Sequence, residues 1–142
     1  MHNMAPEFEK ISGKEDGLNI LILEDDNERV KCFKKNFFGC NLTFTCKVDI
    51  CIEQLESNTF DVLFLDHDLG GEVYVESGKG VETGHDVAKW LSNNLDKSPK
   101  DVIVHSLNPV GADNMVKLIP GSKKIPFAWL KLKYEGKNDT TD

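Results

Sequence analysis

The sequence predicts an α/β protein in which a doubly wound parallel sheet of five strands forms the middle of three layers. Two observations carry this prediction. Short apolar runs alternate with amphipathic stretches along the 142 residues, which is the length of one domain with a single core. The central runs are apolar on consecutive residues, which indicates strands that are buried on both faces, as in a parallel sheet covered by helices.

The first half of the chain contains three predicted strands and two predicted helices. The strands cover residues 18–23 (LNILIL), 43–48 and 60–65 (FDVLFL). A helix is predicted over residues 27–37, where apolar residues form one stripe before a glycine. Asp49 is the predicted N-cap of a short second helix.

The second half begins with a polar stretch over residues 70–84 that contains five glycines. A connection of this length is expected to be a functional flap. Thr83 and Asp86 predict a capping box for the next helix. The apolar stripe of that helix consists of Val87, Trp90, Leu91 and Leu95. The remaining predicted elements are a strand, a helix and a last strand over residues 101–104, 112–119 and 127–132.

The two ends of the chain are polar and lack a repeating apolar pattern. Residues 1–17 are expected to form a flexible or loosely docked arm, and residues 136–142 a tail, so that the domain covers residues 18–135. No helix is predicted after the last strand. One face of the sheet then needs other cover, which either the N-terminal arm or a second copy of the chain, in a homodimer, would supply.

Charge and hydropathy exclude several classes of protein. With 24 acidic residues, 17 basic residues and a net charge of −7, the chain is not expected to bind nucleic acid in bulk or an anionic membrane. Its apolar runs are too short for a transmembrane helix or a signal peptide, so a cytoplasmic location is expected.

Acidic residues follow two of the predicted strands directly. Glu24, Asp25 and Asp26 come after the first strand, and Asp66 and Asp68 come after the third. Ligands of such sheets bind at the carboxyl ends of the strands. Carboxylates that lie this close repel one another unless a cation lies between them. The sequence therefore predicts a site for Mg²⁺, or another divalent cation, with Glu24, Asp25, Asp66 and Asp68 as candidate ligands.

Three histidines fall near the same edge of the predicted sheet. His67 and His105 follow strand ends, and His85 opens the helix after the flap. Together with Asp66 they suit acid/base work on a phosphate ester, with His105 and His67 as the pair and His85 as the alternate. Ligation of a softer metal and plain structural roles are the other two interpretations.

Four further residues are candidates for binding phosphate. Ser106 either donates to a phosphate oxygen or caps a turn, and Asn108 either contacts phosphate or ribose or forms the turn before a proline. Lys79, in the SGKG segment of the flap, either closes over an anion or is a solvated loop residue. Lys131 lies near the end of the last predicted strand, and Lys133 is the competing register for the same role.

The segments LNILILEDDN, FDVLFLDHDLGG, TGHDVAKWL and VIVHS resemble the receiver domain of two-component response regulators. This resemblance implies the strand order 2-1-3-4-5 and a histidine kinase as partner. It places Glu24 and Asp25 on the acidic pair that holds Mg²⁺, and Asp66 on the phospho-accepting aspartate. Ser106 falls on the Ser/Thr that follows the phosphoryl group, and Lys131 is the candidate for the lysine at the end of the last strand.

The segments LDHD, TGHD and HSLNPVGADNM more closely resemble a divergent branch of that superfamily, the cyclic-phosphate processing receiver-like domains. The resemblance implies that the chain binds or hydrolyses the cyclic phosphate of a nucleotide or of an RNA end. Beside Asp25 and Asp66, it assigns to the site His67, His85, His105, Ser106 and Asn108.

Three functions follow as hypotheses. The first is a metal-assisted phosphoesterase that opens a cyclic phosphate. The second is a signalling receiver that a histidine kinase phosphorylates on Asp66. The third is a non-catalytic protein that sequesters cyclic nucleotides, for which a pocket would suffice without an acid/base pair.

Overall fold

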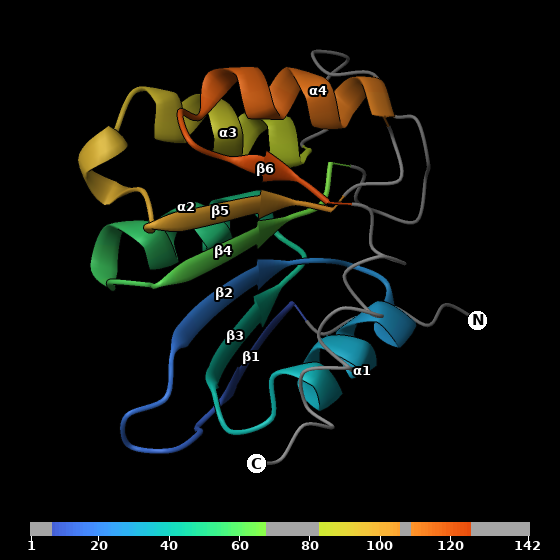
Figure 1. Ribbon diagram of the computed structural model, residues 1–142, viewed down its shortest axis with the longest axis vertical. Helices are drawn as coiled ribbons and strands as arrows, with labels where there is room; N and C mark the ends of the chain where they lie inside the picture. The colour runs from blue at the N-terminus through green and yellow to red at the C-terminus, as the bar shows by residue number, and fades with distance from the viewer. Residues whose placement is uncertain (1–6, 68–82, 106–108, 126–142) are drawn as a thin grey trace.

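The computed structural model describes residues 7–67, 83–105 and 109–125. Within these residues the strands form one sheet in the order β1-β3-β2-β4-β5-β6 (Figure 1). The parallel strands are β2 (Asn19–Leu23), β3 (Asn41–Thr45), β4 (Val62–Leu65), β5 (Asp101–Val104) and β6 (Lys123–Lys124). Their order is the predicted 2-1-3-4-5, so the doubly wound α/β fold is confirmed.

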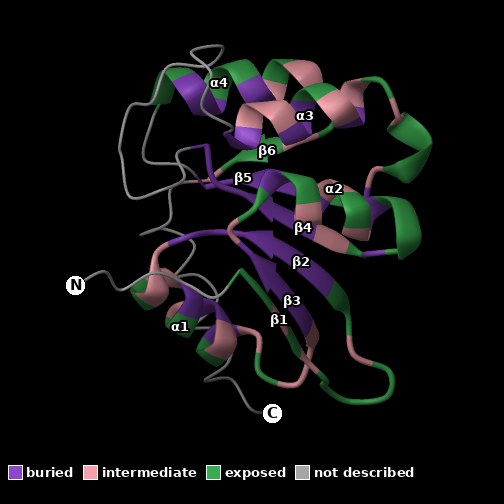
Figure 2. Cartoon of the chain, turned by 180° about the vertical axis from the view of Figure 1, so that it is seen from behind, coloured by how far each residue is buried: buried purple, intermediate pink, exposed green. Residues whose placement is uncertain are grey.

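Helices cover both faces of the sheet (Figures 1 and 2). The helical elements are α1 (Asn27–Asn36), α2 (Val48–Ser57), α3 (Gly84–Ser92), η1 (Leu95–Lys97) and α4 (Pro109–Leu118). The core has one cluster on each face. Ile20 and Ile22 of β2 pack with Phe33 of α1, whereas Leu21 and Leu23 pack with residues of α2, α3 and α4. Successive side chains of a strand point to opposite faces, so the consecutive apolar run of β2 fills both clusters, as the sequence predicts.

The N-terminal segment differs from the predicted arm. Residues Phe8–Ile11 form strand β1, which pairs antiparallel with β3 from Phe8↔Thr45 to Ile11↔Leu42. An ion pair of 3.1 Å between Glu9 and Lys34 connects the strand to α1. Strand β1 has only four residues, two of them charged, so its apolar alternation is too short to predict a strand. Charged residues are typical of a strand at the edge of a sheet.

The last strand also differs from the prediction. The parallel partner of β5 is β6, whose register is Ile103↔Lys123 and Val104↔Lys124. Two exposed lysines at an edge carry no apolar pattern that would predict a strand. The predicted strand over residues 127–132, the expected lack of a last helix and the C-terminal tail all lie outside the described residues.

The capping box of α3 is confirmed, because Thr83 Oγ1 accepts from the His85 N–H and Asp86 Oδ2 accepts from the Thr83 N–H. The predicted stripe is wrong at Leu95, which is half-exposed because α3 ends before it. The predicted cap of α2 is also wrong: Asp49 lies in the first turn of that helix, and Lys47 is its N-cap. None of the helices in the described ranges is both long and apolar enough to span a membrane.

Candidate metal and phosphate site

Three polar side chains meet at the carboxyl edge of the sheet because of the register of its central strands. Leu65 of β4 pairs with Leu23 of β2 and with Val104 of β5. The ladder continues for one more residue, since the Asp66 N–H donates to the Leu23 carbonyl and the His105 N–H donates to the Leu65 carbonyl. The next residue of each strand is therefore placed side by side with the others: Glu24, Asp66 and His105.

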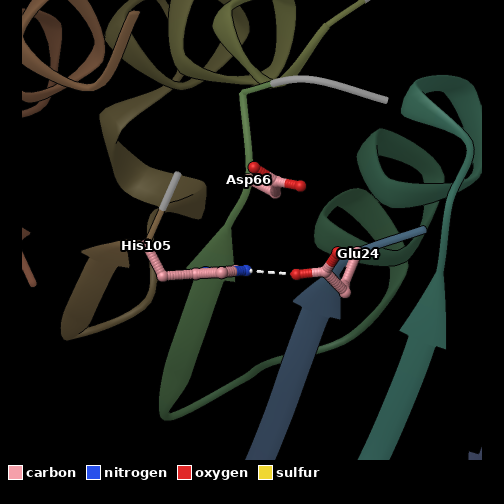
Figure 3. Close-up of side chains that lie close together, drawn as sticks. All are labelled: Glu24, Asp66 and His105. Atoms are coloured by element: carbon pink, nitrogen blue, oxygen red, sulfur yellow. Dashed lines mark hydrogen bonds and ion pairs between the residues drawn. The ribbon is translucent and has the colours of Figure 1, made fainter. Parts of the chain in front are cut away.

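Figure 3 shows these three side chains at the ends of β2, β4 and β5. Each offers one ligand atom, and these atoms lie within 4.8 Å of one another. All three residues are buried, with exposed fractions of 0%, 2% and 1%. His105 Nε2 lies 2.8 Å from Glu24 Oε1, and the imidazole packs edge-on against Phe33, at 5.3 Å between ring centroids. The site therefore lies on the face of the sheet that α1 covers.

The buried carboxylate of Glu24 accepts hydrogen bonds on both of its oxygens. Its Oε2 accepts from the backbone N–H groups of Asp25 and Asp26 at 3.1 and 3.0 Å. Arg29 donates to both carboxylate oxygens at 3.0 Å, from Nε to Oε1 and from Nη2 to Oε2. With His105 these make five donors for about four lone-pair sites, so the carboxylate is saturated.

The hydrogen bonds decide the charge of Glu24. Burial alone would raise the pKa of this carboxyl, but the hydrogen bonds and charges of His105 and Arg29 outweigh burial and lower the pKa from 4.5 to about 2. Burial likewise opposes the charge of Arg29, but Glu24 and Asp66 raise the pKa of the guanidinium above its usual value. Both groups are therefore ionised at neutral pH.

We expect Glu24 to make the protein sensitive to acid. Because its pKa is lower in the folded chain than in the unfolded one, its stabilisation is present above pH 4.5 and is lost as the pH falls toward about 2. The loss should amount to roughly 3 kcal/mol of unfolding free energy. Urea unfolding of wild type and Glu24→Gln between pH 7 and pH 2 measures it. The difference between the two proteins should shrink on acidification, and a constant difference would contradict the prediction.

The donor set suits a divalent cation. Two carboxylates and one imidazole from three adjacent strands provide the mixed oxygen and nitrogen ligands that Mn²⁺ or Zn²⁺ accepts. Mg²⁺ prefers oxygen ligands alone, so the imidazole makes a transition metal the better fit. The residues thus fit a cation in chemistry, although each oxygen of Glu24 is already occupied by protein donors.

Comparison with known proteins identifies the family. Residues 20–120 match the family model of the cyclic-phosphate processing receiver domain. The chain belongs to this family. None of the curated proteins compared with the chain matches it.

Solved structures agree with this receiver domain in fold. The phosphorylated cyanobacterial phytochrome response regulator RcpA is similar with a TM-score of 0.65 and 13% identity, over 87% of this chain and 92% of that one. A response regulator in its Mn²⁺-bound form has a TM-score of 0.63 and 14% identity, over 88% and 97%. A CheY-like receiver domain from Methanospirillum hungatei has a TM-score of 0.59 and 14% identity, over 87% and 95%.

The receiver domain separates its predicted histidines onto two faces of the sheet. His105 packs against α1, whereas His67 lies against α4, where a Cβ on Gly111 would come within 2.6 Å of its ring. The ring of His85, at the start of α3, is 6.4 Å from that of His67. Burial, His67 and Lys89 lower the pKa of His85 and Asp86 opposes them, so this half-buried imidazole is neutral at pH 7.

The predicted ligand Asp25 lies next to the receiver site but outside its ligand cluster. It is buried, with an exposed fraction of 6%, yet its carboxylate is not among the ligand atoms that come together in the described part of the chain. The cluster has Glu24 instead, because Glu24 continues the alternation of Ile20 and Ile22 toward α1.

Five predicted site residues lie outside the described part of this receiver domain. They are the candidate metal ligand Asp68 and the candidate phosphate contacts Lys79, Ser106, Asn108 and Lys131, and the alternative to Lys131, Lys133, lies outside it as well. The flap predicted over residues 70–84 lies outside it too, except for its last two residues.

Sequence reasoning missed Arg29, which contacts both buried carboxylates of the receiver site. Its Nη2 lies 3.0 Å from Glu24 Oε2 and 3.5 Å from Asp66 Oδ2. One signal in the sequence was available. Arg29 is the one arginine among 17 lysine and arginine residues, and it follows the acidic segment within one helical turn. Arginine provides the planar pair of donors that a carboxylate accepts, which lysine does not.

Proposed function

We propose that this receiver domain binds the cyclic phosphate of a nucleotide or of an RNA end at the carboxyl edge of β2, β4 and β5, and opens the ring with the help of a divalent cation. The observation that carries the proposal is the contact between His105 and Glu24 beside the buried carboxylate of Asp66. The family description, cyclic-phosphate processing, supports a ligand of this kind.

Glu24, Asp66 and His105 are the residues that would hold the cation. A divalent ion in such a site offsets the negative charge that develops on phosphoryl oxygens. The net charge of −7 gives no general attraction for polyanions, so recognition of the phosphate has to come from the site itself.

Ring opening needs a base and an acid. Water attacks the phosphorus and gives its proton to the base, while the phosphorus–oxygen bond to the ribose breaks and that oxygen receives a proton from the acid. His85 suits the base because it is half-buried and its lowered pKa keeps it neutral. His67 is its neighbour and would be the acid. Because His105 is bonded to Glu24 and would help to hold the cation, it is neither the acid nor the base in this proposal.

Turnover of a panel of 2′,3′-cyclic nucleotides and cyclic dinucleotides with Mn²⁺ or Mg²⁺, followed by phosphorus NMR, tests the proposal. We expect His85→Asn to lower kcat by about 100-fold or more, which is the usual contribution of one acid/base group. Asp66→Asn should weaken binding of the ligand. Asp101→Asn is the matched control, because this exposed aspartate begins β5 at the opposite edge of the sheet and should change neither quantity.

Two further outcomes distinguish the other two functions, sequestration of the ligand and phosphorylation of Asp66. Saturable binding without turnover would indicate sequestration of the ligand. Incubation with acetyl phosphate and Mg²⁺ tests whether the chain accepts a phosphoryl group, as a receiver that serves a histidine kinase must. The likeness of fold to the phosphorylated response regulator RcpA suggests this experiment. A gain in mass that Asp66→Asn abolishes would favour that function. If the wild type neither binds nor turns over any member of the panel, the cyclic-phosphate proposal is wrong.

A further inference from the structure

We propose that Arg29 is the resident cation of this site, and that a divalent metal binds Glu24 and Asp66 only when the guanidinium has moved away. The inference rests on the proposed cation site and concerns what controls entry to it. It starts from the position of Arg29, whose Nη2 lies 3.0 Å from Glu24 and 3.5 Å from Asp66.

The contacts of Arg29 are those of a cation that neutralises two carboxylates. Its Nε and Nη2 form a parallel pair of hydrogen bonds with the two oxygens of Glu24, the geometry in which arginine binds a carboxylate most strongly. Its Nη2 is shared with Asp66, and its Nη1 lies 3.8 Å from Asp26. One guanidinium therefore contacts carboxylates from both strand ends.

Five hydrogen-bond donors already occupy the two carboxylate oxygens of Glu24, so neither oxygen is open to a metal. The backbone N–H groups of Asp25 and Asp26 are fixed by the turn that leads from β2 into α1. His105 is buried between Phe33 and Phe64. Of the donors to Glu24, Arg29 is the one that can leave without moving the backbone or the core.

The Arg29 side chain is partly exposed, so the guanidinium can move from the site into solvent. Its side chain is 18% exposed, whereas that of Glu24 is fully buried. Rotation about the bonds of this long side chain would carry the charged group into solvent while its base stays on α1. A metal ion and a guanidinium could not occupy the position between Glu24 and Asp66 together, because like charges repel at such a distance. The two cations are thus alternatives at one place.

The test compares Mn²⁺ binding to the wild type and to Arg29→Met by calorimetry, without any phosphate ligand. We expect the variant to bind Mn²⁺ at least tenfold more tightly. Lys31→Met is the matched control, because Lys31 is an exposed cation of the same helix that pairs with Glu28, and it should change the affinity less than twofold. Equal or weaker Mn²⁺ binding by Arg29→Met, or no binding by either protein, would overturn the proposal.

A second measurement covers the case in which Arg29→Met does not fold. The chain has one arginine, so the wild type gives one arginine Nε–H signal in a ¹H–¹⁵N spectrum. Addition of diamagnetic Zn²⁺ should shift this signal and speed its exchange with water at least tenfold. A signal that stays protected at saturating Zn²⁺ would show that metal and guanidinium do not compete. Neither measurement uses a cyclic phosphate. Equal Mn²⁺ binding by the wild type and Arg29→Met would overturn the competition proposed here and leave the proposed function intact, and failure to bind or turn over the cyclic-phosphate panel would leave the competition intact.

Discussion

Replacement of Glu24 by glutamine should lower the free energy of unfolding by about 3 kcal/mol, because it breaks a buried, hydrogen-bonded ion pair at one partner. The amide group would place a donor where the Arg29, Asp25 and Asp26 donors now meet an acceptor. It would also leave Arg29 without its principal counter-charge. Urea unfolding at pH 7, followed by circular dichroism, measures the loss.

Glu28→Gln is the control for this change. Glu28 lies four residues further along the chain, its side chain is 70% exposed, and its ion pair with Lys31 is 3.6 Å long. An exposed pair of this kind contributes little, so the control should stay within about 0.5 kcal/mol of the wild type. If Glu24→Gln and Glu28→Gln lower the free energy of unfolding equally, the hydrogen bonds of the Glu24 carboxylate do not stabilise the fold as predicted.

Replacement of Gly84 by alanine should also destabilise the protein by about 3 kcal/mol, because the added Cβ has no room. It would lie 2.0 Å from the Asp66 carbonyl oxygen and 3.0 Å from the side chain of Met115. The first of these atoms belongs to the backbone of the site and cannot move alone. Displacing it would also strain the hydrogen bond from the Gly84 N–H to the His67 carbonyl, which is 2.9 Å long.

The steric clash and helix propensity predict opposite changes in stability for Gly84→Ala, so the direction of the change distinguishes them. Alanine is a better helix former than glycine by about 1 kcal/mol, so helix propensity alone predicts that the substitution stabilises α3. Lys89→Ala, at an exposed position of the same helix, serves as the control and should change stability by no more than about 0.5 kcal/mol. Thermal unfolding of the three proteins compares them. A more stable Gly84→Ala protein would mean that the start of α3 does not pack against the end of β4 so closely.

The parallel core and its acidic edge could be predicted because their signals are local. Apolar runs end directly in Glu24, Asp66 and His105, and parallel strands bring such ends to one edge of a sheet. Local signals do not tell which face a residue points to. Glu24 and not Asp25 joins the cluster because of the alternation along β2, and that alternation becomes visible only when α1 is known to cover Ile20 and Ile22.

The same reason explains the separation of the histidines and the omission of Arg29. His67 follows Asp66 by one residue and therefore turns to the opposite face, where Gly111 of α4 leaves room for it. Arg29 reaches the site from the first turn of α1, and its contacts depend on how that helix leaves β2. Strands β1 and β6 were beyond prediction because they are short and rich in charge.

Strand β1 pairs with β3 and therefore covers the backbone groups that β3 would otherwise expose at the edge of the sheet. The backbone of β3 bonds on one side to β2 and on the other to β1, so that another polypeptide cannot extend the sheet there by joining β3. At this edge another chain could pair only with β1, which is four residues long. Glu9 of that strand already forms an ion pair with Lys34 of α1. The segment that was expected to form a flexible or loosely docked arm therefore covers the β3 edge, and a shortened chain that began at residue 18 would leave that edge open to pairing with another chain.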